Sequence, residues 1–473
     1  MKKFLLSIFT IVIAFCFKGY SQEINFVEIW AKYGDSAPNW FTDGSEVEQG
    51  DNSFGGVERG IVYSDYSGHV YVSSRHAEDT DSDGTLDQGE PHVYILDPMT
   101  GEAPAFGPSK LLTAGITSAD QYFGGGYPLN NVTCTEDGSI FACNMTLASG
   151  PDIIGETGGV TVKAFRVYRW SWEQDVPQCI IDYKEGSYRL GDKFSVAGNW
   201  ETQAYIYAAP GESNKLLRWS VTAGVVASVP EVITLQDVTQ AGTSITVAAV
   251  PDKADWIYVS GKGFLPTLFN TAGVNLTQVG ITAAGLPSSV IAGRIVKFDN
   301  KLYMGMFSGD QSAFVFNISK HGENVTDADI IGFTPTFGTR YDNAYGEGAV
   351  EFGKIDNQLY VYVCAPSNGI ACYRIDGLVS LKERMVTKDF QLSAFPNPAN
   401  DYTQVSFTLP GDAHGAVSVK VFDVTGRFMG ITAGKAQGGE QVMEINTSNL
   451  APGTYMYQVV YGNRIGIEKF IVK

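Results

Sequence analysis

Six similar segments recur along the chain and limit the folds that it can adopt more than any other feature. Each has an apolar strand, a tight turn with Asp, Asn or Gly, and a second strand rich in Tyr and other apolar residues. Such strands, separated by turn residues, are typical of antiparallel β-structure. The segments begin about 50 to 70 residues apart and cover residues 60–72, 131–142, 193–207, 244–258, 294–304 and 349–361.

This spacing suits the four-stranded blades of a β-propeller, in which each sheet buries its faces only against its neighbours. We predict an all-β fold with a propeller of about six blades; seven blades or a large two-sheet sandwich are the alternatives. The sixth repeat stops after three strands, and the N-terminal run 26–30 could supply the fourth and remove an open edge. Third strands are expected at residues 92–97, 165–170, 215–219, 267–269, 314–316 and 370–375.

The end of the chain has a pattern of its own. It opens on Phe395-Pro396-Asn397-Pro398-Ala399, and two alternating runs follow at 405–409 and 417–423. Period-two alternation broken by Gly and Pro predicts a small Ig-like antiparallel β-sandwich. The other motifs are the turn from Asp423 to Arg427, the step from Leu450 to Tyr455, and the basic, apolar ending 469–473.

In this order, these motifs resemble the type A C-terminal sorting domain of cargo for the type IX (Por) secretion system of Bacteroidetes. The resemblance covers residues from about 390 onward. It implies that the type IX machinery is a partner and that the protein crosses the outer membrane after passing through the periplasm. The domain is then usually cut off, and the cargo is released or attached to the cell surface.

The beginning of the chain has the pattern of a secretory signal peptide. Lys2 and Lys3 precede an apolar run from Phe4 to Phe17, and we expect cleavage after Ser21. That run is shorter than the roughly 20 residues of a membrane-spanning helix, and no later run is longer, so no transmembrane segment is expected in the mature chain. The expected organisation is a signal peptide at 1–21, a propeller cargo domain at 22–380, a linker at 381–389 and the sorting sandwich at 390–473.

One acidic loop between the first two strands and the third strand of the first repeat carries explicit metal chemistry. Residues 79–90 fit the calcium-loop pattern D-x-D-x-D-G-x₅-E at every position. Without a cation, five carboxylates in such a short loop would repel one another. Because no helices flank it, we expect a structural calcium ion and not a sensor; the alternative is a solvated acidic loop. The expected ligands are Asp79, Asp81, Asp83, the carbonyl of Thr85, Asp87 and Glu90.

Two pairs of cysteines flank short turns. Cys134 and Cys143 lie on either side of one turn, and Cys364 and Cys372 on either side of another. An exported protein can form disulfides, so both pairs are candidates; small buried thiols in strands are the alternative. Cys179 is left over and is expected in the core.

Composition and motifs narrow the function without identifying it. The formal net charge of -18 argues against nucleic acid as a partner. The chain has no H-E-x-x-H, G-x-S-x-G or phosphate-loop motif, and His69 and His92 are expected at the surface. Aromatic residues beside Gly or Pro could contact a ligand at one end of a propeller channel, or could pack there instead. They are Trp40, Phe41, Tyr122, Phe123, Tyr127 and Phe264.

Two functions therefore remain open. The first is a non-catalytic surface or secreted protein that binds a glycan, the matrix or a surface protein. The second is a secreted polysaccharide hydrolase or lyase with carboxylates at the channel mouth; no particular pair of carboxylates stands out. The absence of a nucleophile or metal-catalysis motif favours binding. The central region, through its step at 93–101, also loosely resembles uncharacterised propeller-like domains of secreted Bacteroidetes proteins, and this resemblance implies no known activity.

Overall fold

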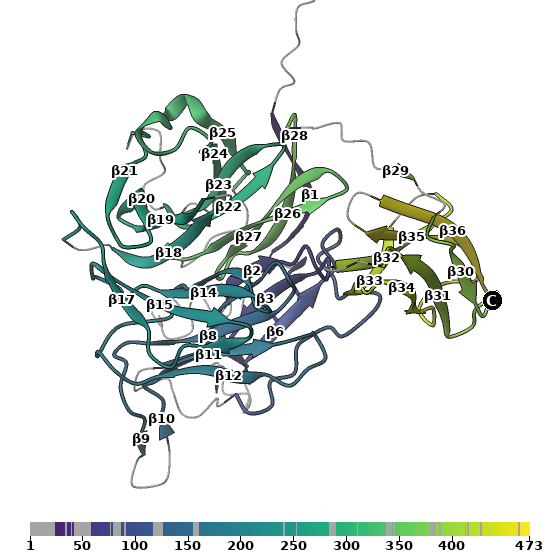
Figure 1. The fold of residues 1–473 in the computed structure, drawn as a ribbon, viewed down its shortest axis with the longest axis horizontal. Helices are drawn as coiled ribbons and strands as arrows, with labels where there is room; N and C mark the ends of the chain where they lie inside the picture. Colours follow the sequence, from purple (N-terminus) through teal and green to yellow (C-terminus); the bar gives the residue numbers. More distant parts are fainter. Residues whose placement is uncertain are drawn as a thin grey trace, which may run out of the picture.

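The protein is built from β-strands (Figure 1). Two 3₁₀ turns are described in full, η2 (Gly322–Asn324) and η3 (Asp327–Asp329). No described helix is long and apolar enough to cross a membrane. The computed structural model describes residues 24–473 except 34–35, 39, 42–57, 76, 79–86, 89–90, 117–125, 155–159, 240–241, 252, 283–289, 310, 337–342, 344–345, 379–384, 387–388, 412, 414–415, 426–427 and 462–463. The expected signal peptide lies outside the described residues.

Six antiparallel sheets follow one another along the chain. Sheet 1 contains β2 (Glu58–Tyr63), β3 (Val70–Ser74) and β6 (His92–Leu96). Sheet 2 contains β7 (Gly126–Cys134), β8 (Ile140–Thr146), β11 (Phe165–Trp170) and β12 (Gln178–Tyr183). Sheet 3 contains β13 (Ser195–Asn199), β14 (Gln203–Ala208), β15 (Lys215–Thr222), β16 (Val225–Val226) and β17 (Glu231–Thr234).

The second half of the series repeats this plan. Sheet 4 contains β18 (Thr243–Val250), β19 (Lys253–Lys262), β20 (Phe264–Asn270) and β21 (Asn275–Gln278). Sheet 5 contains β22 (Val290–Phe298), β23 (Lys301–Ser308), β24 (Ser312–Asn317) and β25 (Ile330–Phe333). Sheet 6 contains β26 (Ala349–Ile355), β27 (Gln358–Ala365), β28 (Gly369–Asp376) and the N-terminal strand β1 (Asn25–Lys32).

Strand β1 pairs antiparallel with β28, from Asn25 opposite Asp376 to Lys32 opposite Ile370. The prediction that the N-terminal run completes the last repeat is confirmed. The candidate third strand of the fourth repeat, 267–269, is also confirmed, because it lies within β20. Two short hairpins complete this part of the chain: β4 (Ala77–Glu78) with β5 (Asp87–Gln88), and β9 (Ile153–Ile154) with β10 (Val160–Thr161).

Each sheet packs against the next through an apolar cluster. Successive side chains of a strand point to opposite faces, so Ile61 and Tyr63 join a cluster with sheet 6 while Val62 joins one with sheet 2. Similar clusters join sheets 2 and 3, 3 and 4, 4 and 5, and 5 and 6. The first strands contact one another in the order β2, β7, β13, β18, β22 and β26, and β26 also contacts β2.

The C-terminal part is a sandwich of two sheets around one apolar cluster. In Figure 1 it lies to one side of the six sheets, in yellow-green. Its larger sheet has the order β29 (Met385–Val386), β36 (Arg464–Val472), β35 (Gly453–Tyr461), β32 (Ala416–Asp423), β33 (Phe428–Lys435). Its smaller sheet has the order β30 (Ser393–Phe395), β31 (Tyr402–Leu409), β34 (Gly439–Asn446).

Candidate binding cavity between the six sheets

A cavity of about 700 Å³ lies where the first strands of all six sheets meet. Its lining comes from the first strands β2, β7, β13, β18, β22 and β26 and from the turns that follow β2, β7 and β18. Successive first strands contact one another, so their inward side chains converge on one space. Small and apolar residues such as Val62, Val196 and Ala249 form part of the wall. The charged lining residues come from sheets 1, 2, 5 and 6; they are Asp65, Glu136, Arg294, Lys297, Glu351 and Lys354.

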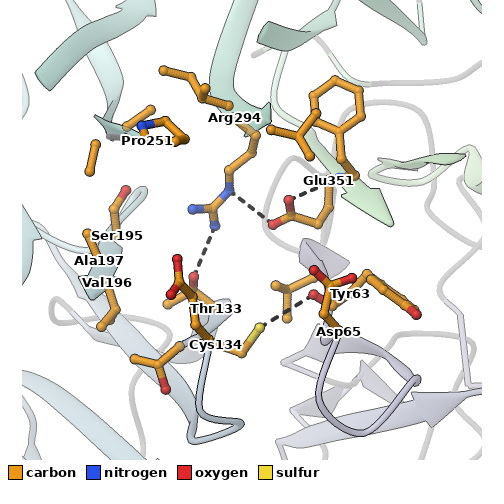
Figure 2. Close-up of a pocket in the computed structure, with 18 of the residues that line it drawn as sticks. Tyr63, Asp65, Thr133, Cys134, Ser195, Val196, Ala197, Pro251, Arg294 and Glu351 are labelled. Carbon is orange, nitrogen blue, oxygen red and sulfur yellow. Dashed lines mark hydrogen bonds and ion pairs between the residues drawn. The ribbon is translucent and has the colours of Figure 1, made fainter. Parts of the chain in front are cut away.

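Arg294 is the central charged residue of the cavity (Figure 2). It extends from β22, and its Nε lies 3.4 Å from Oε2 of Glu351 on β26. Its Nη2 donates to the hydroxyl of Thr133 on β7 at 3.3 Å. Both charged side chains are largely buried, with exposed fractions of 17% and 14%. The guanidinium therefore joins three sheets across the cavity and still has N–H groups to offer, since it carries five donors.

The pKa of the Glu351 carboxyl is raised. Burial raises its pKa, and the nearby carboxylate of Asp65 acts in the same direction, while Arg294 and the backbone N–H of Phe352 oppose the shift. That N–H donates to Oε1 of Glu351 at 2.9 Å. A carboxyl with a raised pKa gains a proton more readily than an exposed one, so this group can serve either as an acceptor or, once protonated, as a donor.

The rim of the cavity carries a second, more exposed ion pair. Lys354 Nζ lies 3.0 Å from Oδ2 of Asp65, and both side chains are about half exposed. Cys134 also lines the cavity and contacts the carbonyl of Tyr63 at 3.4 Å. Burial raises the pKa of the Cys134 thiol. Since the thiolate is the nucleophile, this cysteine is suited to packing and not to covalent catalysis.

Buried polar groups fill the opposite end of the first strands. Lys193, just before β13, donates to the carbonyl of Arg59 at 2.7 Å, and Nδ2 of Asn131 donates to the same oxygen at 3.4 Å. Ser244, at the start of β18, donates to Oε1 of Glu347. Burial lowers the pKa of Lys193 to about 8, although Glu347 opposes the shift. These contacts link the first strands to one another at the end away from the cavity.

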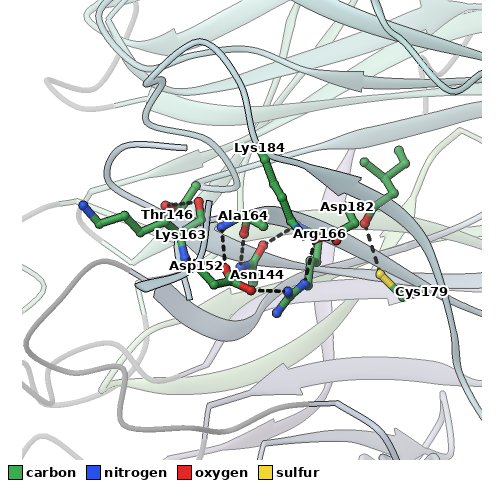
Figure 3. A network of polar contacts seen from close by, with 10 residues as sticks. Asn144, Thr146, Asp152, Lys163, Ala164, Arg166, Cys179, Asp182 and Lys184 are labelled. Atoms are coloured by element: carbon green, nitrogen blue, oxygen red, sulfur yellow. Dashed lines mark hydrogen bonds and ion pairs between the residues drawn. The ribbon is translucent and has the colours of Figure 1, made fainter. Parts of the chain in front are cut away.

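A further polar cluster lies in sheet 2, around Arg166 (Figure 3). Its guanidinium bonds Oδ2 of Asp152 at 2.6 Å and Oδ1 of Asp182 at 2.9 Å. Burial alone would raise the pKa of Asp152, but the backbone N–H groups of Ala164 and Lys163, together with Arg166, lower it. Because its charges are paired, this cluster fastens the excursion between β8 and β11 to its sheet and offers little to a ligand.

The aromatic residues predicted for ligand contact do not line the cavity where the structure describes their side chains. The ring of Trp40 stacks on Tyr94, with centroids 4.0 Å apart, and Phe41 is buried between sheets 1 and 6. Phe264 in β20 packs against the cluster between sheets 3 and 4. The packing alternative therefore describes all three. Tyr127 lies in β7 opposite Met145, and Tyr122 and Phe123 lie outside the described residues.

The two predicted disulfides are absent, and all five cysteines in the described residues are free. Cys179, expected in the core, is instead exposed. Cys134 lies opposite Ile140 and Cys143 opposite Asn131, so this pair is three positions out of register and points to opposite faces. Cys364 lies opposite Ile370, and Cys372 opposite Tyr362. That pair is two positions out of register, a displacement of roughly 6.6 Å along the strands, which is too far for a disulfide between facing strands.

The predicted calcium loop lies mostly outside the described residues. Of its six expected ligands, Asp87 falls in a described strand, where β5 places it opposite Glu78 of β4. Asp79, Asp81, Asp83, Thr85 and Glu90 are outside the described residues.

Sequence reasoning missed the charged residues of the cavity and misplaced two histidines. Arg294 and Glu351 each interrupt an apolar first strand. A charged residue at such a position was the sequence signal that could have identified them as cavity residues. His69 and His92, expected at the surface, are buried. The ring of His69 is held by Glu173, whose Oε1 lies 2.6 Å from Nδ1, and this long-range pairing has no local sequence signature.

Two family models match parts of the chain. Residues 393–473 match the secretion system C-terminal sorting domain, and residues 104–293 match a domain of unknown function, DUF8500. No curated protein matches. A DUF4623 family protein from Bacteroides eggerthii is 16% identical with a TM-score of 0.48, over 72% of this chain and 77% of that one.

Two glycosidase structures show weaker similarity. The GH43_1 enzyme from Xanthomonas citri complexed with xylose is 10% identical with a TM-score of 0.35, over 69% of this chain and 90% of that one. A glycosyl hydrolase from Bacteroides ovatus is 9% identical with a TM-score of 0.35, over 74% and 94%. The sorting-domain match covers strands β30 to β36 of the sandwich. The chain is therefore a cargo of the type IX secretion system that is secreted or displayed at the cell surface.

Proposed function

We propose that the exported part is a six-bladed β-propeller that binds a glycan, matrix or surface-protein ligand in its central cavity. The observation that carries the proposal is the cavity itself, which all six first strands line and into which Arg294 and Glu351 project. Its volume of about 700 Å³ falls within the range of small-molecule sites. The contact of β26 with β2 and the packing of sheet 6 on sheet 1 support the propeller.

The lining suits a ligand rich in hydroxyl groups. The guanidinium of Arg294 supplies donors, the carboxyl of Glu351 supplies acceptors, and Thr133 supplies a hydroxyl that can do both. Val62 and Phe352 provide apolar surface beside them. A few polar groups in a partly apolar cavity fix the orientation of a ligand and give specificity. One sugar residue or a short side chain of a larger partner fits this arrangement.

Replacement of Arg294 by Ala is expected to weaken binding to the glycans recognised on an array by roughly tenfold or more, because hydrogen bonds to charged groups contribute about 1.5–3 kcal/mol. Arg218→Ala is the matched control. Arg218 has nearly the same exposed fraction, 16%, and pairs with Glu231 on sheet 3, away from the cavity. Equal binding by the wild type and Arg294→Ala, at unchanged stability, would exclude the cavity as the site.

A polysaccharide hydrolase or lyase is the second candidate, and one observation favours it. Glu351 and Asp65 are two carboxyl groups in one cavity, and burial together with Asp65 raises the pKa of Glu351. One protonated and one ionised carboxyl are the groups that glycoside hydrolysis requires. Product analysis of every glycan bound on the array separates the candidates. Binding without turnover supports the binding protein, and turnover that Glu351→Gln abolishes supports the enzyme.

We also propose that the acidic loop at 79–90 holds a structural calcium ion. Its five carboxylates suit a hard cation, and extracellular calcium would occupy even a site with a dissociation constant of about 10⁻⁴ to 10⁻³ M. Chelation is expected to lower the melting temperature by about 2–4 °C, which corresponds to roughly 1 kcal/mol of lost binding energy. The variant Asp81→Asn/Asp83→Asn should melt at the lower temperature with or without chelator. An unchanged melt, together with no metal by elemental analysis, would contradict this proposal.

A further inference from the structure

Side chains of the described residues join the C-terminal sandwich to the six sheets at three places. Phe106, in the loop after β6, is buried within the sandwich's apolar cluster. Its ring packs on the backbone of β33 so closely that a Cβ at Gly430 would lie 2.4 Å from it. The side chain of Ile431 packs in the same way on Gly68, in the turn after β2. Lys420 on β32 lies 3.1 Å from Asp356, in the turn after β26.

The sandwich lies beside the six sheets, with β32 and β33 on the side that faces them (Figure 1). On the side of the six sheets, the contacts come from three segments. Two are the turns that follow the first strands of sheets 1 and 6, and the third is the loop after β6. Asp65 and Lys354, which border the cavity, belong to or adjoin the same two turns. On the sandwich side, the contacts come from β32 and the edge strand β33. The sandwich therefore stands beside the mouth of the cavity without lining it.

Internal bonds hold the cargo side of this contact in place. The turn that contains Gly68 is fixed by Ser67, whose hydroxyl lies 2.7 Å from that of Tyr71. Glu173 accepts from Tyr71 at 2.7 Å and pairs with His69 at 2.6 Å, and all four side chains are buried. Since these bonds lie within the cargo, the turn needs no sandwich to take its shape. A surface formed before binding loses little conformational entropy when a partner docks.

We propose that this surface, made of the Gly68 turn, Phe106 and Asp356, is a docking site for the chain's own sorting domain and retains that domain after the linker is cut. A large side chain buried in a well-packed pocket from which water is excluded is typical of a binding hot spot, and Phe106 is buried in this way within the sandwich cluster. The Lys420–Asp356 pair lies at the edge, with Asp356 half exposed, and contributes orientation more than affinity. The proposal does not depend on the identity of any ligand.

The test uses the full chain with a protease recognition sequence inserted after residue 380, before strand β29 of the sandwich. After cleavage at about 10 μM, the two parts are expected to co-elute from a size-exclusion column. Gly430→Ala places a methyl group against the Phe106 ring and is expected to weaken the association roughly tenfold, because the overpacked ring must shift. Gly434→Ala is the matched control. It lies on the same strand, where an added Cβ meets only Met443 at an ordinary 3.6 Å.

Phe106→Ala tests the same contact from the cargo side, in a loop outside the six sheets' clusters. It should also weaken co-elution, while Gly434→Ala leaves it unchanged. Circular dichroism melts of the uncut variants check that both parts remain folded. Separation of the wild-type parts on cleavage would overturn the proposal. So would co-elution that neither Gly430→Ala nor Phe106→Ala reduces, because the two parts would then associate through another surface.

Discussion

Deletion of residues 393–473 is expected to abolish the appearance of the protein outside the cell and to leave it in the periplasm. The matched sorting domain is confined to those residues, and it is the part that the type IX machinery recognises. The apolar clusters between the six sheets contain no residue of the sandwich, so the truncated chain retains what it needs to fold. Immunoblots of periplasmic, surface and culture-medium fractions measure the effect.

Transfer of the tail is the matching experiment. Residues 390–473 fused to a reporter with a signal peptide should carry the reporter across the outer membrane. Phe106→Ala in the full chain should be exported like the wild type if sorting depends on the domain itself and not on its docking. Efficient release of the truncated chain would contradict the prediction, because export would then depend on a signal in the remaining part.

The strands could be predicted from the sequence because their signals are local. Each repeat carries its own alternation and turn residues, and the missing strand of the last repeat was enough to predict the role of residues 26–30. The pairing of β1 with β28 confirms this prediction, although the two strands lie at opposite ends of the cargo sequence. An unpaired edge strand exposes a row of backbone donors and acceptors. Pairing of this edge with the N-terminal strand, which no other sheet uses, is therefore favoured.

The site could not be predicted because it depends on contacts between distant repeats. Arg294 and Thr133 are 161 residues apart, and no spacing rule connects them. The disulfide prediction failed for a related reason. It required the two cysteines of each pair to lie opposite each other, and the residues between them do not determine which residues of the two strands pair. The docking of the sandwich was also missed, because Phe106 lies in a loop without periodicity and its partner, Gly430, has no side chain to give a signal.

Trp30 holds the two ends of the series of sheets together. It lies in β1 of sheet 6, opposite Cys372, and is buried between sheets 1 and 6. Its Nε1 donates to the carbonyl of Pro98 at 2.9 Å, and its ring packs on Gly101 in the turn after β6 of sheet 1. One side chain therefore bonds and packs across the junction where the last sheet meets the first.

Trp30→Ala is expected to lower the free energy of unfolding by about 3–5 kcal/mol, because it removes a large buried side chain and leaves a cavity at that junction. Urea unfolding followed by far-UV circular dichroism measures the loss. Val27→Ala is the control on the same strand, where the side chain is 36% exposed and the expected loss is below about 1 kcal/mol. A loss equal to that of Val27→Ala would mean that β1 merely covers an edge. A loss several times larger would show that closure of sheet 6 on sheet 1 stabilises the whole cargo domain, because separating these two sheets exposes the apolar cluster between them.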